Sequence, residues 1–411
     1  MDPSTSSNRD RNFRRMFFGY GALLATIMAA CLIVIAWRCL DFGSARKLQK
    51  MKVTTHEPVT LPGGSWRFIV SGDSRNCGDV VMPAIAAHSA QFAPSFYWHL
   101  GDLRAIYKID EDMAFEAANH AQVLTCDNYE RLAWSDFITN QISPFANVPF
   151  YLGIGNHEVI PPKDKDEDAF KRQFYDWLDL PVLQDQRQKD KEPPQPEPYY
   201  HWIQGGVDFI YLDNASGSFS PGQLSWLQHR LNSAKTDSAV KSLVVGMHEA
   251  LPDSIANSHS MGDKGAGSPG SISGGKAYDA LASFRDGSRK PVYVLASHSH
   301  FYMENIFDTS KLKANGARPL PGWIVGTAGA VRYPLPFGAP QTAETDVYGY
   351  LLATVSQDGT IQFSFQEVYE SDVPLSVRQR YPEALVPWCF AHNSQNKDPI
   401  ARDITPTCAA R

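Results

Sequence analysis

Five short apolar segments of this chain end in the same way, and this repetition constrains the fold more than any other feature. Each segment is accompanied by a small residue and is followed by Asp, Asn or His. The segments and their polar ends are residues 67–70 with Asp73, 96–100 with Asp102, 148–154 with Asn156, 243–247 with His248, and 292–296 with His298 and His300. Short apolar runs bounded by turn residues are typical of buried strands. Since parallel strands bind ligands at their carboxyl ends, the pattern predicts that these polar residues converge.

The residues at these strand ends are of the types that bind metals. Carboxylate, amide oxygen and imidazole are ligands for Zn, Mn or Fe, and no thiolate is among them. A single Gly-Asp or a single His after a strand is more often an ordinary turn or a hydrogen-bonded residue. Five such ends in one chain favour a shared metal site, because unrelated turns have no reason to carry ligand types each time.

In this order, the motifs resemble those of the calcineurin-like metallophosphoesterase superfamily: Asp-x-His, Gly-Asp, Gly-Asn-His-Asp/Glu, a lone His and Gly-His-x-His. The resemblance covers residues 67–302. It implies an α/β fold in which two packed mixed β-sheets are flanked by α-helices as a four-layer sandwich. It also implies two divalent or trivalent metal ions (Mn, Zn or Fe) and a phosphorylated substrate. The implied reaction is hydrolysis of a phosphate monoester or diester by a metal-bridging hydroxide.

The resemblance also implies a role for each motif residue. The first metal would be held by Asp73, Asp102 and His300, and the second by Asp102, Asn156, His248 and His298. Asn156 would also face the substrate. His157 would face the phosphate and protonate the leaving group, with Glu158 as its orienting partner. Arg104 is expected to add to a local basic patch that contacts the substrate.

The first motif departs from the family pattern, because Arg75 stands where a histidine ligand is usual. A guanidinium stays protonated and has no lone pair for a metal, so Arg75 is not a ligand. In one hypothesis, three protein ligands and water still hold the first metal. In a second, which we favour, Arg75 takes part in catalysis by binding the substrate phosphate with its planar fork. In a third, Arg75 pairs with a nearby acid and the first metal binds weakly or not at all.

Two further positions, Ser297 and Ala105, can be compared with the family motifs. Ser297 replaces the usual Gly of the last motif, a mild change because Ser also fits a tight turn. Relatives that resemble purple acid phosphatases also lack the first-motif histidine and use a Tyr four residues after the Gly of the second motif. Ala105 occupies that place here, and Tyr107 is only a loose substitute. The alternative function is therefore a catalytically silent envelope protein that binds a phosphorylated ligand through an incomplete site.

The N-terminus predicts where the protein works. Residues 16–37 carry no charge before Arg38 and are long enough to cross a bilayer as a helix. Arg14-Arg15-Met16-Phe17-Phe18 also resembles a twin-arginine export signal. We expect an uncleaved anchor with the catalytic domain outside the cytoplasm. Secretion after cleavage near Gly43-Ser44-Ala45 is the alternative.

Composition and cysteine content agree with an exported enzyme. The net charge is −6 and no long basic run occurs, so no nucleic-acid partner is expected. Cys31 and Cys39 lie in or beside the apolar segment, and the other four cysteines lie in the rest of the chain: Cys77, Cys126, Cys389 and Cys408. An oxidising compartment would allow two disulfides among these four in any of three pairings, and four unpaired thiols are the alternative.

The remaining sequence predicts the domain limits and several elements. The predicted parts are residues 1–15 (tail), 16–37 (anchor), 38–64 (linker), 65–370 (catalytic domain) and 371–411 (C-terminal extension). Helices are expected at residues 82–91, 168–180 and 222–231, and hairpins at 199–203 with 207–213 and at 348–355 with 360–368. Residues 184–198 are expected to form a surface loop. Residues 253–276 are expected to form a substrate lid or a disordered loop, with His259 in solvent.

Overall fold

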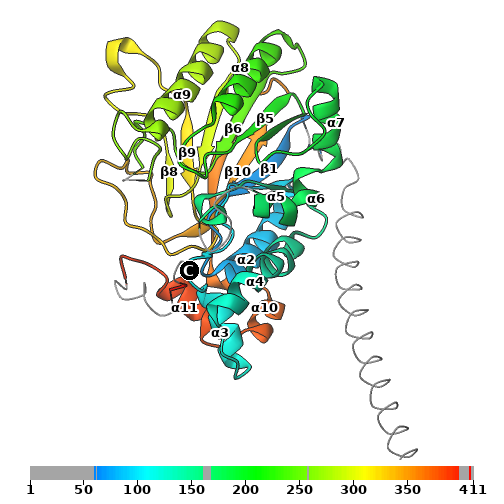
Figure 1. Cartoon of the computed structure of the whole chain (residues 1–411), viewed down its shortest axis with the longest axis vertical. Coiled ribbons are helices and arrows are strands. Elements are labelled where there is room, and N and C mark those ends of the chain that lie inside the picture. The colour runs from blue at the N-terminus through cyan, green and yellow to red at the C-terminus, as the bar shows by residue number, and fades with distance from the viewer. Residues whose placement is uncertain (1–59, 62, 161–167, 257–258, 398–406, 409–411) are drawn as a thin grey trace, which may run out of the picture. The chain divides into compact units, whose positions relative to one another are not determined.

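The computed structural model describes residues 60–61, 63–160, 168–256, 259–397 and 407–408 (Figure 1). These residues belong to one compact unit that runs from Thr55 to Arg411. The predicted membrane segment, residues 16–37, and most of the predicted linker lie outside the described residues. Within the described ranges, no helix is long and apolar enough to cross a membrane.

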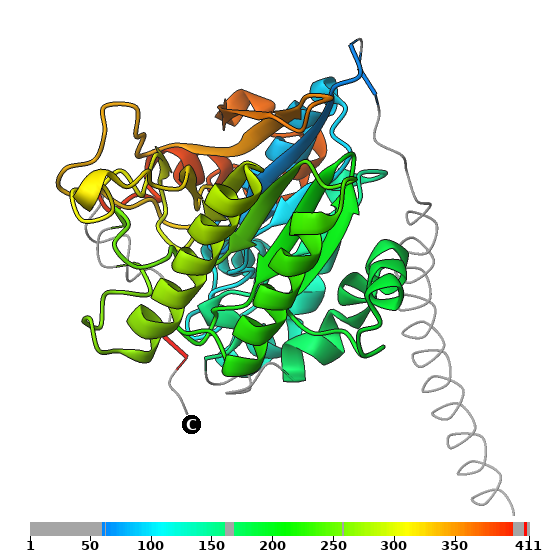
Figure 2. The same ribbon diagram turned by 90° about the horizontal axis from the view of Figure 1, so that it is seen from above.

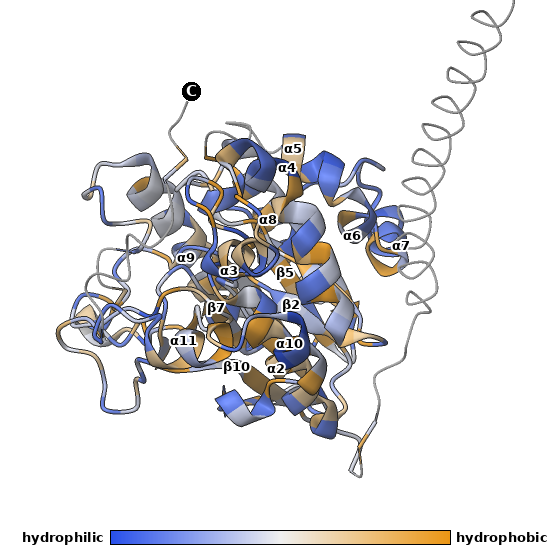
Figure 3. Cartoon of the chain, turned by 90° about the horizontal axis from the view of Figure 1, so that it is seen from below, coloured by the Kyte–Doolittle hydropathy of each residue, from blue (hydrophilic) through white to orange (hydrophobic). Residues whose placement is uncertain are grey.

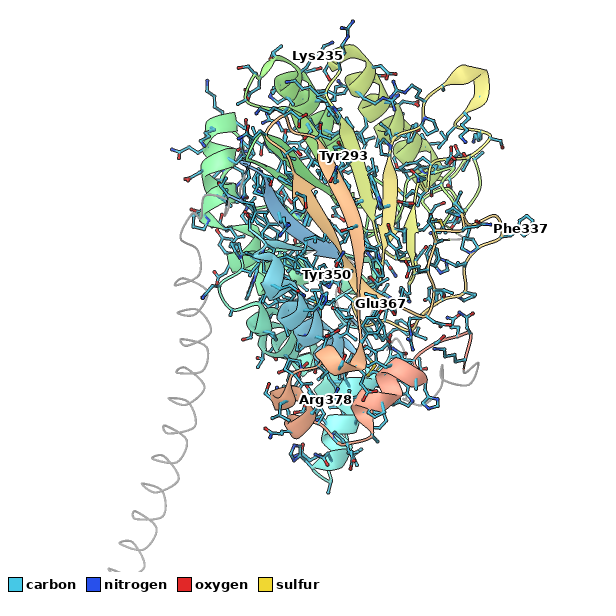
Figure 4. The ribbon with its side chains drawn as sticks, turned by 180° about the vertical axis from the view of Figure 1, so that it is seen from behind. Lys235, Tyr293, Phe337, Tyr350, Glu367 and Arg378 are labelled. Atoms are coloured by element: carbon cyan, nitrogen blue, oxygen red, sulfur yellow. A yellow bond between two sulfur atoms is a disulfide. The ribbon has the colours of Figure 1, made fainter. Side chains whose placement is uncertain are left out.

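A five-stranded mixed sheet has the strand order β11-β10-β1-β2-β3. Its strands are β1 (Trp66–Ser71), β2 (Tyr97–His99), β3 (Phe150–Leu152), β10 (Tyr348–Val355) and β11 (Ile361–Val368). The first three run parallel, and β10 pairs antiparallel with both β1 and β11. Figure 4 shows the β10–β11 hairpin from behind, with Tyr350 and Glu367 on it. The hairpin predicted at residues 348–368 is thus confirmed.

A six-stranded mixed sheet has the strand order β4-β5-β6-β7-β9-β8. Its strands are β4 (Tyr200–Gln204), β5 (Val207–Leu212), β6 (Ser242–Met247), β7 (Val292–Ala296), β8 (Tyr302–Glu304) and β9 (Gly322–Val325). The inner four strands run parallel, and β4 and β8 pair antiparallel at the two edges. The predicted hairpin of β4 and β5 is confirmed.

Buried aromatic rings fill the space between the two sheets. Tyr151 of β3 stacks on Trp202 of β4 with ring centroids 3.9 Å apart. Phe68 of β1 meets Phe209 of β5 edge to face at 5.0 Å. Such pairs contribute about 0.5–1.5 kcal/mol each beyond the area they bury. This packing fixes one sheet against the other, so that the ends of their parallel strands share one site.

Two long helices cover the outer face of the six-stranded sheet. Figure 2 shows α8 (Pro221–Thr236) and α9 (Pro269–Ser288) side by side over the strands. Leu227 and Leu281 belong to the same buried cluster as Val245 of β6. Each helix begins after a serine whose side chain accepts a hydrogen bond from a backbone N–H of the first turn. The predicted helix at residues 222–231 is confirmed as part of α8.

The remaining helices lie mostly around the five-stranded sheet and at its ends. They are α2 (Gly78–Ser89), α3 (Glu111–Asn119), α4 (Cys126–Phe137), α5 (Asp168–Gln173), α6 (Tyr175–Leu178), α7 (Pro181–Asp190), α10 (Leu375–Arg380) and α11 (Leu385–Ala391). Figure 3 shows hydrophobic colour gathered in the strands and polar colour over much of the surrounding helices. The predicted architecture of two mixed sheets flanked by helices is therefore confirmed.

Two predicted loops are partly helical. Helix α7 (Pro181–Asp190) takes residues 184–190 of the expected surface loop, because Pro181 suits the first helical position and Leu183 is buried. Helix α9 takes residues 269–276 of the expected lid. Its glycines permit close packing, since a Cβ on Gly274 would lie 2.5 Å from Pro252 Cδ. The tertiary contacts here outweigh the low helix propensity of glycine.

Two disulfides join the C-terminal residues to the rest of the unit. Cys77 is bonded to Cys389, and Cys126 is bonded to Cys408. The first bond links the start of α2 to α11, and the second links the start of α4 to the C-terminal segment. The structure thus selects one of the three pairings that the sequence leaves open.

Candidate metal centre

The predicted ligand residues come together at the carboxyl ends of five parallel strands from both sheets. Asp73 follows β1, Asp102 follows β2, Asn156 follows β3, His248 follows β6, and His298 and His300 follow β7. The side chains divide into two groups that share Asp102. Four of the residues are almost completely buried: Asp73, Asp102, His248 and His300.

Three of these residues have left-handed backbone, which is uncommon for residues other than glycine. The φ angles are 61° at Asp73, 60° at Asp102 and 67° at His298. The backbone N–H of Asp73 donates to the carbonyl of Gly101 at 3.0 Å, so the turns after β1 and β2 hold each other. Strained backbone of this kind clusters at functional sites, where the surrounding contacts enforce it.

The second donor group surrounds Nε2 of His248. That atom lies 3.0 Å from Asn156 Oδ1, 3.0 Å from His298 Nδ1 and 3.3 Å from Asp102 Oδ1. Nδ1 of His248 lies 3.1 Å from the carbonyl oxygen of Leu100, so Nδ1 carries the proton and Nε2 presents its lone pair. Burial and the neighbouring His248 hold the pKa of His298 well below its usual range, which favours the neutral, metal-binding form. Four nitrogen and oxygen donors that converge in this way fit a Zn, Mn or Fe ion.

The first donor group contains Asp73, Asp102 and His300. Asp73 Oδ1 lies 3.3 Å from His300 Nε2. Asp73 Oδ1 and Asp102 Oδ2 are buried and accept no hydrogen bond from the described residues. Burial raises the pKa of Asp73, but the adjacent His300 lowers it further, so the carboxylate stays ionised. The two carboxylate oxygens therefore call for a nearby positive charge.

The guanidinium of Arg75 lies inside this first group. Its Nη2 is 3.1 Å from His300 Nε2, and its Nε is 3.7 Å from Asp102 Oδ2. Its Nη1 is 2.5 Å from His157 Nε2. The side chain is only 6% exposed, so it does not extend into solvent. Burial lowers its pKa, but Tyr333 and Asp102 raise it further, so Arg75 remains a cation.

His157 is fixed by contacts on both sides of its ring. Its Nδ1 lies 2.6 Å from the carbonyl oxygen of Ala105 and therefore donates the hydrogen bond. Its backbone N–H donates to Asp102 Oδ1 at 3.0 Å. Burial and the positive charge of Arg75 lower the pKa of His157 to about 3. The ring is thus neutral, and its Nε2 accepts a hydrogen bond from Arg75.

Glu158 holds the turn that carries Asp102. Its carboxylate accepts hydrogen bonds from the backbone N–H groups of Asp102 and Leu103, both at 2.9 Å, and of Gly155 at 2.7 Å. The predicted contact with the His157 ring is not among its hydrogen bonds in the described residues. Glu158 therefore orients Asp102 directly, and it reaches His157 only through the backbone of the short helix Asn156–Glu158.

Arg104 lies in a buried cluster of carboxylates and does not face the candidate site. The surrounding acids are Asp79, Asp110, Asp112 and Asp136. Nη1 of Arg104 donates to Asp112 Oδ1 at 2.8 Å, and the side chain is completely buried. This placement contradicts the prediction that Arg104 contacts the substrate. A buried arginine requires such partners, and several distant acids reach it only in the folded chain.

Three aromatic residues beside the site had little or no sequence signal. The ring of Tyr333 stacks on His300 with centroids 3.9 Å apart. His259 was expected in solvent, yet it is half-buried, and its ring lies 5.2 Å from those of His298 and Tyr333. The ring of Tyr107 lies 5.0 Å from that of His157. Tyr333 belongs to no motif, so only the tertiary structure reveals it.

A pocket of about 500 Å³ opens beside these residues. Arg75, Tyr107, Lys108, His259 and Tyr333 contribute to its wall. Residues of the C-terminal segment, Asn393, Gln395 and Thr407, complete the wall on another side. Arg75 therefore forms the boundary between the buried donor groups and a space large enough for a small ligand.

Comparisons with known proteins agree with this arrangement. A family model described as calcineurin-like phosphoesterase matches residues 76–302, more than half of the chain. A search of curated proteins found no match. Among solved structures, a purple acid phosphatase from yellow lupin (Lupinus luteus) seeds is similar with a TM-score of 0.51. That similarity has 16% sequence identity and covers 75% of this chain and 54% of the lupin chain.

A structure of PhoD is also similar, with a TM-score of 0.45 and 16% identity over 75% of this chain and 70% of the other. At this level of identity, the lupin phosphatase shows that the fold is shared, and this chain spans about half of its length. The family match carries more weight, since it includes every candidate ligand except Asp73. Its extent and the convergence of those ligands show that this chain is a member of the calcineurin-like phosphoesterase family.

Proposed function

We propose that this protein hydrolyses a phosphate monoester or diester with a metal-activated hydroxide. The observation that carries the proposal is the second donor group, in which three donor atoms lie within 3.3 Å of His248 Nε2. A bound metal ion would lower the pKa of a coordinated water and polarise the phosphoryl oxygens. The dinuclear centre with a bridging hydroxide that the family resemblance implies would require the first donor group as well.

The side chain of Arg75 can bind the substrate phosphate. Arg75 lies between the donor groups and the pocket, and its guanidinium fork suits two phosphoryl oxygens. His157 accepts a hydrogen bond from one side of this fork and thereby orients it. These contacts support the hypothesis that Arg75 binds the substrate phosphate.

The leaving group also needs a proton as the ester bond breaks. The family resemblance assigns this proton transfer to His157, and this assignment stays a prediction. In the described arrangement, Nδ1 of His157 donates to Ala105 and Nε2 faces Arg75. His157 would therefore need Arg75 to move toward the substrate before its Nε2 could exchange a proton with the leaving group.

A catalytically silent protein that binds a phosphorylated ligand is the second candidate. The hydrogen bond from Arg75 to His300 favours it, because this bond leaves the first donor group incomplete. The two candidates differ in turnover. A silent protein would bind inorganic phosphate through Arg75 and would release no phosphate from any ester.

We also propose that the domain works outside the cytoplasm, held to a membrane by residues 16–37. Two disulfides in the described residues support this location, since such bonds persist in oxidising compartments. The proposed substrate is then a phosphorylated compound of the envelope or the external medium.

The proposed function can be tested with purified full-length protein. Release of p-nitrophenol from p-nitrophenyl phosphate and from bis(p-nitrophenyl) phosphate is measured with added Mn²⁺ or Zn²⁺ and after chelation. We expect metal-dependent turnover of at least one ester. His248→Ala should lower turnover by at least about 100-fold, since the central donor of the second group is lost. His229→Ala is the matched control, because His229 is exposed on α8. No turnover of either ester with any added metal would contradict the enzymatic proposal.

A further inference from the structure

His300 has one lone pair with which it could bind a metal in the first donor group, and that lone pair accepts a hydrogen bond from Arg75. Nδ1 of His300 lies 2.7 Å from the carbonyl oxygen of Val331, so Nδ1 carries the proton and donates. Nε2 is then the unprotonated nitrogen, with a single lone pair. Nη2 of Arg75 lies 3.1 Å from that atom and donates to it. A metal ion would have to sit about 2.0–2.1 Å from Nε2 along the same direction.

The Arg75 guanidinium also supplies positive charge to the first donor group. Asp73 and Asp102 are both completely buried. Two buried carboxylates need a positive charge close by, which a metal ion normally supplies. Arg75 places a permanent positive charge beside Asp102, with its Nε 3.7 Å from Oδ2. A second cation at this place would meet the repulsion of the guanidinium at short range.

The surrounding residues hold Arg75 in this position. Nε2 of His157 accepts a hydrogen bond from Nη1, and His157 itself is fixed by its bond to Ala105. The hydroxyl of Tyr333 accepts a bond from Nη2 at 3.5 Å, while the Tyr333 ring stacks on His300. The backbone after Arg75 is fixed too, since the N–H of Asn76 donates to Asp110 at 2.6 Å. These contacts hold the Arg75 guanidinium inside the first donor group.

We propose that the guanidinium of Arg75 takes the place of the first metal ion. The centre then binds one metal, held by Asp102, Asn156, His248 and His298, and Arg75 is the second positive charge that faces the phosphate. This inference rests on the proposed function, because it concerns the same site. It differs from the dinuclear centre that the family resemblance implies, and His157 becomes a positioning residue for Arg75.

The test is the number of metal ions bound per chain. Full-length protein is loaded with Mn²⁺, freed of unbound metal and analysed for metal and protein content. We expect one ion per chain in the wild type and two in Arg75→His, since histidine restores the ligand type that the family motif has at this position. Arg75→Lys keeps a cation there and should retain one ion. His248→Ala should bind none, because the second donor group then lacks its central nitrogen.

The EPR spectrum of the Mn²⁺-loaded protein provides a second readout that does not depend on activity. The wild type should show an isolated ion, and Arg75→His should show a spin-coupled pair. Two ions per wild-type chain would overturn the inference and leave the proposed function intact. A folded Arg75→His that still binds one ion would also overturn it. If Arg75→His does not fold, Arg75→Ala serves instead, with a second, weaker ion expected. Absence of any bound metal in the wild type would remove the proposed function and this inference together.

Discussion

At the scale of single residues, a glycine makes room for Asp102, the carboxylate that the two donor groups share. Gly155 precedes Asn156 at the end of the strand that carries the Asn-His-Glu motif. A Cβ built on Gly155 would lie 2.3 Å from Asp102 Oδ1 and 2.4 Å from the Asp102 backbone nitrogen. Both are far shorter than ordinary contacts, and backbone atoms cannot move away cheaply. A close approach of two backbones is a common reason for glycine at a functional site.

The variant Gly155→Ala should therefore displace Asp102 and weaken metal binding. We expect the affinity for Mn²⁺ to fall by about 10–100-fold, the range found when groups that orient metal ligands are removed. Isothermal titration of the full-length protein measures this change. Gly275→Ala is the control, since a Cβ on Gly275 in α9 meets nothing within 4 Å. Equal Mn²⁺ affinities in the two variants would refute the steric role of Gly155.

At the scale of elements, a buried ionic cluster joins α7, β4, β5 and α8. His201 of β4 lies between Asp208 of β5 and Asp190 of α7, with its two ring nitrogens 2.8 Å and 2.7 Å from their carboxylates. Arg230 of α8 pairs with Asp190 at 2.6 Å. Asp190, Glu192 and His201 have the spacing of a metal-binding group. Arg230 already supplies the positive charge there, so we assign the cluster to the joining of these elements.

This cluster predicts a pH-dependent stability. Burial lowers the pKa of His201, but Asp208 and Asp190 raise it more, to about 9 from its usual 6.5. Because the folded pKa is the higher one, the stabilisation is complete below pH 6.5 and is lost as the pH rises to about 9. The loss amounts to at most about 3 kcal/mol of unfolding free energy.

Denaturant unfolding of the full-length protein between pH 6 and 10 measures this loss. The variant His201→Gln has no imidazole to titrate, so its unfolding free energy should decline less steeply with pH than that of the wild type. The difference between the two slopes isolates His201 from other titrating groups. Identical slopes would show that His201 is not protonated in the folded state at neutral pH.

At the scale of the whole molecule, the disulfides join residues that are very far apart in sequence. Cys77 and Cys389 are 312 residues apart, and Cys126 and Cys408 are 282 apart. The backbone N–H of Cys408 donates to the carbonyl of Tyr107 at 2.7 Å, beside the pocket. The second bond thus brings the C-terminal residue Thr407 to the pocket wall. Long closed loops of this kind reduce the entropy of the unfolded chain.

Removal of the first disulfide should destabilise the protein without removing its metal donors. The double variant Cys77→Ser with Cys389→Ser should lose about 2–5 kcal/mol of unfolding free energy. Denaturant unfolding measures this loss. In the presence of a reducing agent, the unfolding free energy of the wild type should fall by at least as much. Unchanged stability in the double variant would mean that these cysteines are not bonded in the folded protein.

The sequence by itself determined the pattern of strands and the ligand types at their ends. Alternation of apolar runs and turn residues is local, so it survives in a linear sequence, and the two hairpins and helix α8 follow from it. The order of Asp73, Asp102, Asn156, His248, His298 and His300 indicated the family for the same reason. Arg75 could also be recognised as a departure, because its chemistry differs from that of histidine.

Only the tertiary structure decided what surrounds each of these residues. It placed Arg104 among four acids, set Glu158 against the Asp102 turn and brought Tyr333 onto His300. It also chose the disulfide pairing and put the Arg75 guanidinium against His300. Such contacts join residues that are distant in the chain, and their energies depend on burial and direction, which no local pattern records. The contact between the Arg75 guanidinium and the lone pair of His300 therefore distinguishes the proposed single-metal centre from a dinuclear one.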